Sequence, residues 1–297
     1  MATMVLDIGG TAIKSGLFDG ETLSDIQETP TEARLGGAHV VQQLKDIIAS
    51  YRERCSFDRI GISTAGQVDP VRGQIIYANE NIPGYTGTRL GEIIAQTFRV
   101  PTAVENDVNA AAIGESVFGA GKDRKEFVCL TYGTGVGGAI FSGGRLYSGC
   151  SYSAGEFGAI VTHPEDRDIE SDMFSGCYEK YASATALVKS AVQMDPALDN
   201  GRKIFERIDE PEVRALVDRW TMEIVYGLIT IVHMLNPECV ILGGGIMEQP
   251  CVLEQLREKL YPNIMPSFRH VQIERAALGN RAGMLGAAVL ERVRMMR

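Results

Sequence analysis

The sequence predicts an α/β protein built from two similar lobes. Two stretches, "VLDIGGTAIKSGLFDG" at 5–20 and "CLTYGTGVGGAIFSGG" at 129–144, follow one order: an apolar strand, a glycine turn, an alternating strand and a closing glycine. Further strand and helix patterns follow each copy, and the length of 297 residues agrees with two domains rather than one. We therefore expect two α/β lobes that face each other across a ligand-binding cleft.

The elements of the first half are predicted by hydrophobic pattern and glycine punctuation. "MVLDI" is an apolar run that ends at a Gly-Gly turn, and "TAIKSGLF" alternates between polar and apolar residues. "RIGIST" is typical of a buried strand, and "TAVEND" leads into the Ala-rich "VNAAAIGESVF". The expected elements are strands at 4–8 and 11–18, a helix at 37–54, strands at 59–64 and 102–107, and a helix at 108–118.

The second half repeats the opening pattern and then becomes largely helical. The expected elements are a strand at 126–133, a hairpin at 137–149 with Gly143 and Gly144 at its turn, mostly helical chain at 179–236, a buried strand at 239–246 and a closing helix at 283–293. The predicted N-terminal lobe is 1–117 and the C-terminal lobe is 118–297, with a final helix at about 283–295 expected to pack back on the first lobe.

Composition and charge exclude several classes of protein. The net charge of −9 is spread along the chain with no run of Lys or Arg, which disfavours nucleic acid and anionic membranes as partners. Six cysteines are scattered without a CxxC pair, as is usual in a reducing compartment. The start, "MATMVLDIGG", lacks a basic region followed by an apolar one, and no run of 18 apolar residues occurs. We expect a cytoplasmic protein that crosses no membrane.

Gly133, Gly135 and Gly138 in "LTYGTGVGG" have the spacing of the dinucleotide-binding fingerprint. That fingerprint requires a helix directly after the glycines, with its N-terminus at the pyrophosphate. Here the glycines are followed by "AIFSGGRLY", which alternates and turns like a hairpin. The pattern therefore argues against NAD and favours a glycine turn between two strands, whose bare backbone lets phosphate approach.

Three glycine turns share this character: "DIGGTAIK" at 7–14, "YGTGVGG" at 132–138 and "LGGGI" at 242–246. Each by itself has the alternative interpretation of a simple tight turn, and the occurrence of three favours a phosphate ligand. Asp7 ends a strand beside the first turn, where a carboxylate is suited to hold the waters of a phosphate-bound Mg²⁺. Thr11 and Thr134 offer hydroxyl groups to phosphate oxygens.

Five motifs together resemble those of one family. "DIGGTAIKSGLF", "ENDVNAAAIGE", "LTYGTGVGGAIFSGGRLYSG", "AGEFG" and "NPECVILGGGI" occur in the order, and at about the spacings, of the ROK family of bacterial sugar kinases. The resemblance covers essentially the whole chain. It implies two RNase-H-like lobes of the actin/Hsp70/hexokinase ATPase superfold, ATP with Mg²⁺ in the interlobe cleft, and phosphoryl transfer to a sugar hydroxyl.

The resemblance also implies roles for single residues. Asp107 in "ENDVNAAA" matches the family's general base, whereas the pattern alone leaves open that Asp107 is an N-cap of the Ala-rich helix. Glu156 lies among small and apolar residues, where a carboxylate is costly unless it is paired or faces a ligand. The implied sugar-binding residues are Gly66, Asn79, Asn106, Asp107, Glu156 and Glu179. The implied residues for ATP and its Mg²⁺ are Asp7, Gly9, Gly10, Thr11, Lys14, Gly133, Thr134, Gly135, Gly244 and Gly245.

The chain departs from the family at the motif that binds structural zinc. Many members carry a His three residues after the Glu of "AGE" and a C-x-C-G-x-x-G-C run, but this chain has Ala159 and "ESDMFSGC". A mixed site of Glu170, Asp172, Cys177 and His163 is a poor zinc pattern, so we predict no zinc. Ala159 would leave room at the anomeric end of the sugar, as the aglycone of a β-glucoside requires.

Two other functions compete with the kinase. ROK repressors carry an N-terminal helix-turn-helix, which is not expected here because the first strand begins at about Met4. A non-catalytic sugar sensor stays an alternative, and an ATPase or chaperone of the same superfold is disfavoured by the sugar-site residues. We expect a homodimer that acts on glucose, N-acetylmannosamine, fructose, allose or a β-glucoside, a choice that the sequence leaves open.

Overall fold

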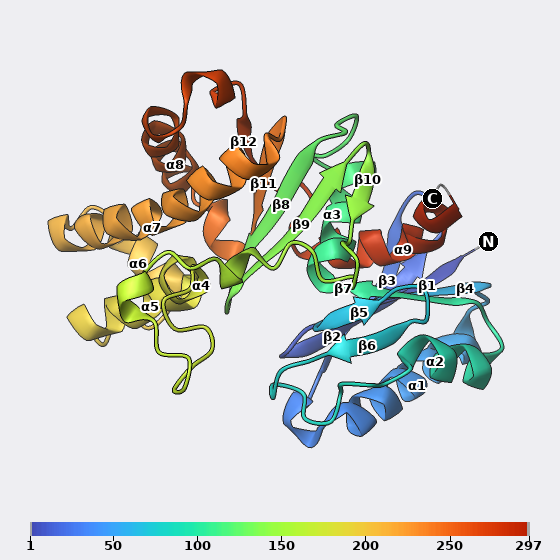
Figure 1. The fold of residues 1–297 in the computed structure, drawn as a ribbon. Helices are drawn as coiled ribbons and strands as arrows, with labels where there is room; N and C mark the ends of the chain where they lie inside the picture. The colour runs from blue at the N-terminus through green and yellow to red at the C-terminus, as the bar shows by residue number, and fades with distance from the viewer. Residues whose placement is uncertain (1, 296–297) are drawn as a thin grey trace. The chain divides into compact units, whose positions relative to one another are not determined.

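The computed structural model describes residues 2–295, with side chains as far as Glu291. Contacts divide the chain into two compact units. Unit 1 comprises the chain up to Lys122, the segment Ser148–Ala154 and the chain from Asn280 onward, and unit 2 comprises Asp123–Tyr147 and Gly155–Gly279. Figure 1 shows the elements of both units.

Both units contain a five-stranded sheet with the same order of strands. In unit 1 the order is β3-β2-β1-β4-β7, where β1 pairs antiparallel with β2 and parallel with β4, and β4 pairs parallel with β7. In unit 2 the order is β10-β9-β8-β11-β12, with the same sequence of antiparallel and parallel pairings around β8 and β11. The predicted duplication is therefore confirmed at the level of the strand order.

The elements of unit 1 agree with the expected strands and helices and add several more. The elements are β1 Thr3–Ile8, β2 Ala12–Phe18, β3 Leu23–Pro30, α1 Gly37–Arg54, β4 Arg59–Thr64, β5 Gln67–Asp69, β6 Gln74–Tyr77, α2 Leu90–Phe98, β7 Thr102–Asn106, α3 Asp107–Phe118 and α9 Ala282–Met295.

The elements of unit 2 confirm the predicted hairpin, the helical region and the buried strand. They are β8 Phe127–Tyr132, β9 Val136–Ser142, β10 Arg145–Tyr147, α4 Glu179–Ala182, α5 Ala184–Met194, α6 Gly201–Glu206, α7 Pro211–Leu235, β11 Cys239–Gly243, α8 Pro250–Asn263 and β12 Gln272–Arg275. Gly143 and Gly144 both have positive φ at the turn between β9 and β10, as a two-residue hairpin of this type requires.

The unit 1 sheet is covered on both faces, and the two-residue period of β1 decides what each face meets. Met4, Leu6 and Ile8 belong to the apolar core that α1 and α2 complete. Val5 and Asp7 point to the opposite face, where α9 packs on β1 and β4 and lies beside α3 (Figure 1). A carboxylate of β1 therefore faces a helix from the far end of the chain.

Glycines let α9 approach its neighbours backbone to backbone. A Cβ atom at Gly61 of β4 would lie 2.0 Å from the carbonyl oxygen of Ala287 in α9. A Cβ atom at Gly286 of α9 would lie 1.7 Å from the carbonyl oxygen of Ala110 in α3. Since no side chain fits at these two positions, glycine sets the depth at which α9 sits against unit 1.

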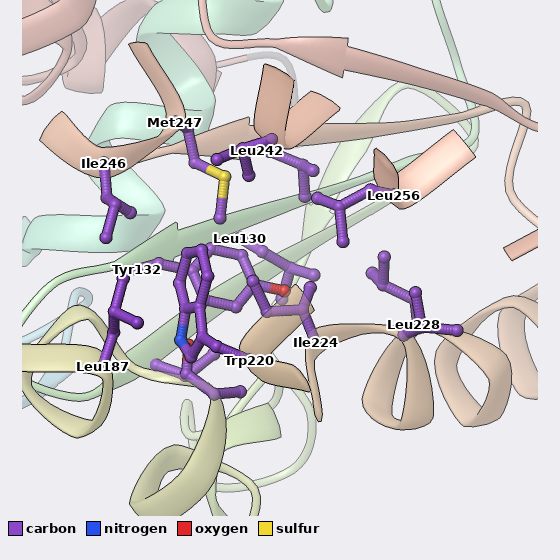
Figure 2. Packing of buried hydrophobic residues seen from close by; sticks show 14 of the residues in the cluster. Leu130, Tyr132, Leu187, Trp220, Ile224, Leu228, Leu242, Ile246, Met247 and Leu256 are labelled. Atoms are coloured by element: carbon purple, nitrogen blue, oxygen red, sulfur yellow. The ribbon is translucent and has the colours of Figure 1, made fainter. Parts of the chain in front are cut away.

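Unit 2 has its own core, which lies between its sheet and the helices α5, α7 and α8 (Figure 2). Leu130 and Tyr132 of β8 and Leu242 of β11 face Ile224 and Trp220 of α7 there. The indole of Trp220 donates to the carbonyl oxygens of Ala182, the last residue of α4, and Ser183, the N-cap of α5, each at 3.1 Å, so its polar atom is satisfied in the core.

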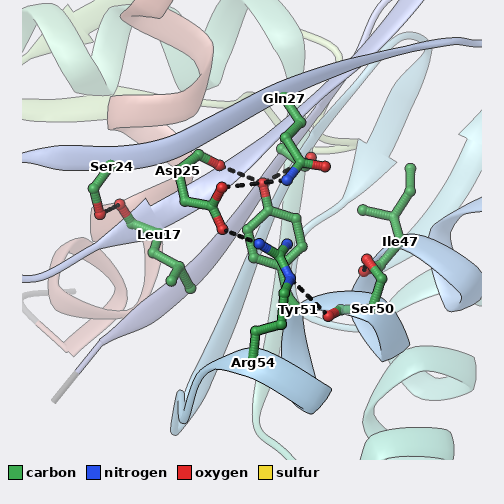
Figure 3. A network of polar contacts seen from close by, with 9 residues as sticks. Leu17, Ser24, Asp25, Gln27, Ile47, Ser50, Tyr51 and Arg54 are labelled. Atoms are coloured by element: carbon green, nitrogen blue, oxygen red, sulfur yellow. Dashed lines mark hydrogen bonds and ion pairs between the residues drawn. The ribbon is translucent and has the colours of Figure 1, made fainter.

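At the edge of the unit 1 sheet, a polar network ties β3 to α1 (Figure 3). Asp25 has φ of 46° and lies where the register between β2 and β3 shifts, which marks a bulge. Its carbonyl accepts from the Tyr51 hydroxyl, and its carboxylate pairs with Arg54 at 3.0 Å. A bulged and charged edge resists pairing with another strand.

Among residues 2–295, no helix combines the length and the apolar character needed to cross a bilayer. All six cysteines lie among these residues as free thiols.

Candidate active site

The predicted site residues of unit 1 gather at the carboxyl ends of three neighbouring parallel strands. The register pairs Asp7 of β1 with Ser63 of β4, and Thr64 of β4 with Asn106 of β7. Parallel strands that end together place their last side chains and the following loops along one edge of the sheet, where ligands of such sheets bind. Asp7, Asn106 and Asp107 thus lie together although about 100 residues separate them in sequence.

The Asp7 carboxylate is held by a residue that sequence reasoning missed. The Ser63 hydroxyl donates to Asp7 Oδ1 at 2.6 Å. Burial raises the pKa of Asp7, while the Ser63 hydrogen bond and the charge of Lys14 act in the opposite direction. Lys14 stands opposite Asp7 in the β1–β2 register, and its ammonium group donates to the carbonyl oxygen of Asn280 at 3.3 Å.

Asp107 is the first residue of α3, and its carboxyl group is partly buried. Burial, and then the negative charge of Asp7, raise the pKa of Asp107 to about 6. Oδ1 accepts from the Val108 N–H and from the Asn106 side chain, each at 2.9 Å. The interpretation of Asp107 as the helix N-cap is wrong, because the N-cap of α3 is Asn106.

Asn106 is hydrogen-bonded at every position of its amide. Oδ1 accepts from the N–H groups of Val108 and Asn109, each at 3.0 Å, which caps α3. Nδ2 donates to the carbonyl oxygen of Gly66 and to the Asp107 carboxylate, each at 2.9 Å. The residue therefore joins the loop after β4 to the start of α3 and fixes the direction of the Asp107 carboxylate.

Gly66 and Asn79 are brought toward each other by the β5–β6 hairpin. Gly66 has φ of 94°, and a Cβ atom there would lie 2.8 Å from the carbonyl oxygen of Tyr77. Asn79 follows two residues after Tyr77 and is exposed, with Oδ1 accepting from the Asn81 N–H at 3.1 Å. Gly66 is thus required by both the backbone conformation and the space, whereas Asn79 organises its own loop.

The first glycine turn is tightly bonded at its base and open at its tip. The Gly9 N–H donates to the carbonyl oxygen of Ala12 at 3.0 Å, and the Thr31 hydroxyl donates to the carbonyl oxygen of Gly9 at 2.7 Å. Gly10 and Thr11 are exposed, and the Cβ position of Gly10 faces open space. This is the geometry of a rigid turn with an accessible backbone.

In unit 2, the second and third glycine turns meet at the carboxyl ends of the parallel strands β8 and β11. Thr131 and Gly243 are register partners at the end of this pair. Gly244 has φ of 101°, and a Cβ atom there would lie 2.2 Å from the carbonyl oxygen of Tyr132. Gly245 opens a short 3₁₀ helix, and its own Cβ position faces open space.

The three glycines of the fingerprint spacing serve three different purposes. Gly133 lies at the exposed tip of the turn with Thr134, and its Cβ position is open. A Cβ atom at Gly135 would lie 2.5 Å from Oε2 of Glu179, and one at Gly138 would lie 2.2 Å from the Phe157 ring. β9 begins at Val136, directly after Gly135, and contains Gly138, so the prediction that no helix follows the glycines is confirmed.

Glu179 lies against the second glycine turn. It is the first residue of α4, and its half-buried carboxylate accepts from the Val136 N–H. Burial raises the pKa of Glu179, and the neighbouring Glu156 adds to this rise. Glu156 is exposed, so the cost expected for a carboxylate enclosed by small and apolar residues does not arise here.

The residues considered for a mixed metal site have other partners. His163 stacks on Tyr181 and pairs with Glu223 at 3.5 Å. Asp172 pairs with Lys180 at 2.6 Å. Within residues 2–295, no group of three or more His, Cys, Asp or Glu side chains is arranged to hold a metal ion.

Comparison with known proteins gives consistent matches over nearly the full length. The model of the ROK family matches residues 3–293. A protein of Clostridium perfringens named only as uncharacterized is 37% identical and covers 95% of both chains. The β-glucoside kinase of Listeria innocua is 31% identical over 97% of this chain and 96% of its own. The crystal structure of a ROK family glucokinase from Streptomyces griseus in complex with glucose and AMPPNP is 31% identical, with a TM-score of 0.84 over 98% of this chain and 99% of its own.

Proposed function

Since the chain belongs to the ROK family, we propose that it is an ATP-dependent sugar kinase that transfers the γ-phosphate of ATP to a hydroxyl of a hexose or hexose derivative. The observation that supports this function most directly is the position and the raised pKa of the Asp107 carboxyl group. Its carboxylate stands at the ligand-binding edge of the unit 1 sheet with a pKa of about 6, and Asn106 holds its direction. A carboxylate of this kind is ionised at neutral pH and basic enough to take a proton.

In the proposed reaction Asp107 is the general base. It accepts the proton of the sugar hydroxyl as that oxygen bonds to the γ-phosphorus, while the bond between the γ-phosphorus and the bridging oxygen of the departing ADP breaks. General-base catalysis of this kind contributes about 10²- to 10⁴-fold to the rate. Burial raises the basicity of the carboxylate, so the surroundings of Asp107 support this role.

Asp7 fits a role toward the Mg²⁺ that accompanies ATP. Ser63 occupies Oδ1, while Oδ2 accepts from no donor in the described part of the chain, and a carboxylate oxygen suits a cation that keeps most of its water ligands. When bound, Mg²⁺ neutralises charge on the phosphates. Lys14, which stands opposite Asp7, adds a positive charge at the same end of β1.

The glycine turns are assigned to the nucleotide. We assign the phosphates to the bare backbone of Gly9–Thr11 in unit 1 and Gly133–Gly135 in unit 2, and the adenosine to Gly244 and Gly245. The open Cβ positions at Gly10, Gly133 and Gly245 support this assignment, because a ligand can approach the backbone there.

For the sugar, we propose a hexose whose anomeric end has room for a further group. Ala159 is exposed in the 3₁₀ turn after Glu156, so no bulky side chain stands at this position. The 31% identity to a β-glucoside kinase supports testing β-glucosides beside free hexoses.

We also propose that the fold needs no structural zinc. The loop that precedes Glu179 is held by Arg167, whose Nη1 donates to the carbonyl oxygens of Met173 at 2.7 Å and Ser175 at 2.6 Å and contacts Cys177 Sγ at 3.4 Å. A guanidinium group can thus serve as the central cross-link of this loop.

A cytoplasmic homodimer is proposed for the working form. Free thiols at all six cysteines, each of which is described, suit a reducing compartment. Tyr226 and Met234 of α7 are exposed apolar side chains that suit a subunit interface.

The decisive experiment is ADP release with Mg·ATP against a panel of hexoses, N-acetylhexosamines and β-glucosides. We expect sugar-dependent turnover that Asp107→Asn lowers by about 10²-fold or more in kcat/KM. Asp46→Asn is the matched control, since Asp46 is exposed on α1 and accepts from the exposed Gln42 at 2.9 Å. Sugar binding without turnover would instead support a sensor, and normal turnover by Asp107→Asn would refute the base.

A further inference from the structure

We propose that Gly283, in the first turn of α9, is a positioning residue for the Asp7 carboxylate. The proposal rests on the function proposed for Asp7 and adds a residue from the far end of the chain to that site. Both residues belong to unit 1.

The contact between the two residues is close and selective. A Cβ atom at Gly283 would lie 2.7 Å from Oδ1, 2.9 Å from Cγ and 3.0 Å from Oδ2 of Asp7. Apart from the backbone of α9 itself and the adjoining residues, these three carboxylate atoms are the nearest heavy atoms to that position. Even the smallest side chain at Gly283 therefore displaces the carboxylate of Asp7.

The Asp7 carboxylate has little freedom to give way. The Ser63 hydroxyl donates to Oδ1 at 2.6 Å, and the short Asp side chain can move only by turning about two bonds. A movement away from Gly283 changes the Ser63 hydrogen bond and the direction of Oδ2 together. Oδ2 is the oxygen that we assign to the water ligands of Mg²⁺.

Glycine has no other evident purpose at this position. Gly283 lies within the helix with ordinary helical backbone, where alanine is more favourable than glycine because glycine loses more backbone entropy. The space that the Asp7 carboxylate takes up accounts for the unfavourable choice.

A second contact brings the same segment to the site. The Lys14 ammonium group donates to the carbonyl oxygen of Asn280 at 3.3 Å, three residues before Gly283. The positive end of the α9 dipole also favours a negative carboxylate beside its first turn. The chain from Asn280 to Gly283 thus contacts both Lys14 of β2 and Asp7 of β1, which stand opposite each other in the register.

The first test measures the contact without using activity. Urea unfolding is followed for wild type, Gly283→Ala, Asp7→Ala and the double variant. We expect Gly283→Ala to lower the unfolding midpoint when Asp7 is present and to leave it unchanged or raise it in the Asp7→Ala background. If the single variant Gly283→Ala does not fold but the double variant with Asp7→Ala does, this outcome supports the proposal as well. Equal changes in both backgrounds, or failure to fold in both, overturn it.

The second test measures positioning. We expect Gly283→Ala to raise the Mg²⁺ concentration for half-maximal turnover at least tenfold, with the KM of the sugar unchanged. Gly201→Ala is the control, because the Cβ position of Gly201 at the start of α6 faces open space. An unchanged Mg²⁺ requirement overturns the positioning role even if the contact is found. Absence of any sugar-dependent turnover in wild type refutes the kinase function instead, and the unfolding experiment still decides whether Gly283 sets the place of Asp7.

Discussion

Asp7 and Asp107 are two carboxyl groups at one sheet edge whose pKa values are both raised by burial. They differ in the charge that lies beside them. The positive charge of Lys14 and the Ser63 hydrogen bond act against the rise in the pKa of Asp7, whereas the negative charge of Asp7 adds to the rise in the pKa of Asp107. The surroundings of Asp107 therefore suit proton transfer, and those of Asp7 suit a negative charge beside a cation.

The pH dependence of turnover follows from this difference. A general base must be ionised, so kcat/KM is expected to rise with pH through an apparent pKa of about 6 and to level off above it. A pH profile from 4.5 to 8 with the best sugar measures this limb, and Asp46→Asn is expected to reproduce it. A rate that stays constant down to pH 5 would contradict Asp107 as the base.

At the scale of the element, the junction of β7 and α3 combines a helix cap with the position of the proposed base. The cap residue Asn106 and the proposed base Asp107 are adjacent, so the same turn that starts the helix also directs the carboxylate. The spare amide N–H of Asn106 reaches Gly66, which extends the arrangement to the loop after β4. Stability of the junction and placement of the base are therefore coupled.

Asn106→Ala is expected to cost about 1–2 kcal/mol in the free energy of unfolding through the lost cap, and to lower kcat as well. Asn106→Ser separates the two effects, because serine is also a good N-cap residue but lacks the amide N–H groups that donate to Gly66 and Asp107. We expect near-normal stability with reduced kcat for Asn106→Ser. Full activity of Asn106→Ser would show that the donated hydrogen bonds do not position the base.

A second element whose packing depends on single residues is α9, because its glycines let it approach its neighbours closely. Gly286→Ala places a methyl group against the Ala110 carbonyl oxygen, and we expect a loss of about 1–3 kcal/mol in the free energy of unfolding. Gly201→Ala, in open space, is expected to be neutral or slightly stabilising in the same urea titration. Equal stability of the two variants would mean that α9 sits further from α3 than the structure shows.

At the scale of the whole molecule, two units of the same strand order each carry glycine turns at the carboxyl ends of parallel strands. Each unit also has its own apolar core, formed in unit 1 by β1 with α1 and in unit 2 by β8 and β11 with α7. Stability is thus carried by apolar burial in both units.

Removal of metal ions tests whether the fold is stable through apolar burial alone, without structural zinc. Dialysis against a chelator is expected to leave the melting temperature unchanged, since Arg167 holds the loop before Glu179 without a metal ion. Turnover is expected to return when Mg²⁺ alone is added back. A melting temperature that falls on chelation and recovers only with zinc would contradict the proposal that the fold needs no zinc.

Local patterns predicted much of the fold. The helix at 37–54 was predicted with its observed bounds, because its ends are marked by glycine and by the change from helical to strand pattern. The β5–β6 hairpin and α2 were not predicted, since β5 and β6 have only three and four residues and give little periodicity. β3 was missed because it is an edge strand with almost wholly exposed residues.

The amino-acid sequence by itself determined the repeated strand-turn-strand pattern, the positions of the glycine turns and the family, because these depend on neighbours in the chain and on motifs read along it. The proximity of Ser63 and Gly283 to Asp7 was decided only by the tertiary structure. A serine in a strand and a glycine in a helix carry no local signal of function. They acquire one when parallel pairing brings β4 beside β1 and when the packing of α9 brings its first turn to the same carboxylate.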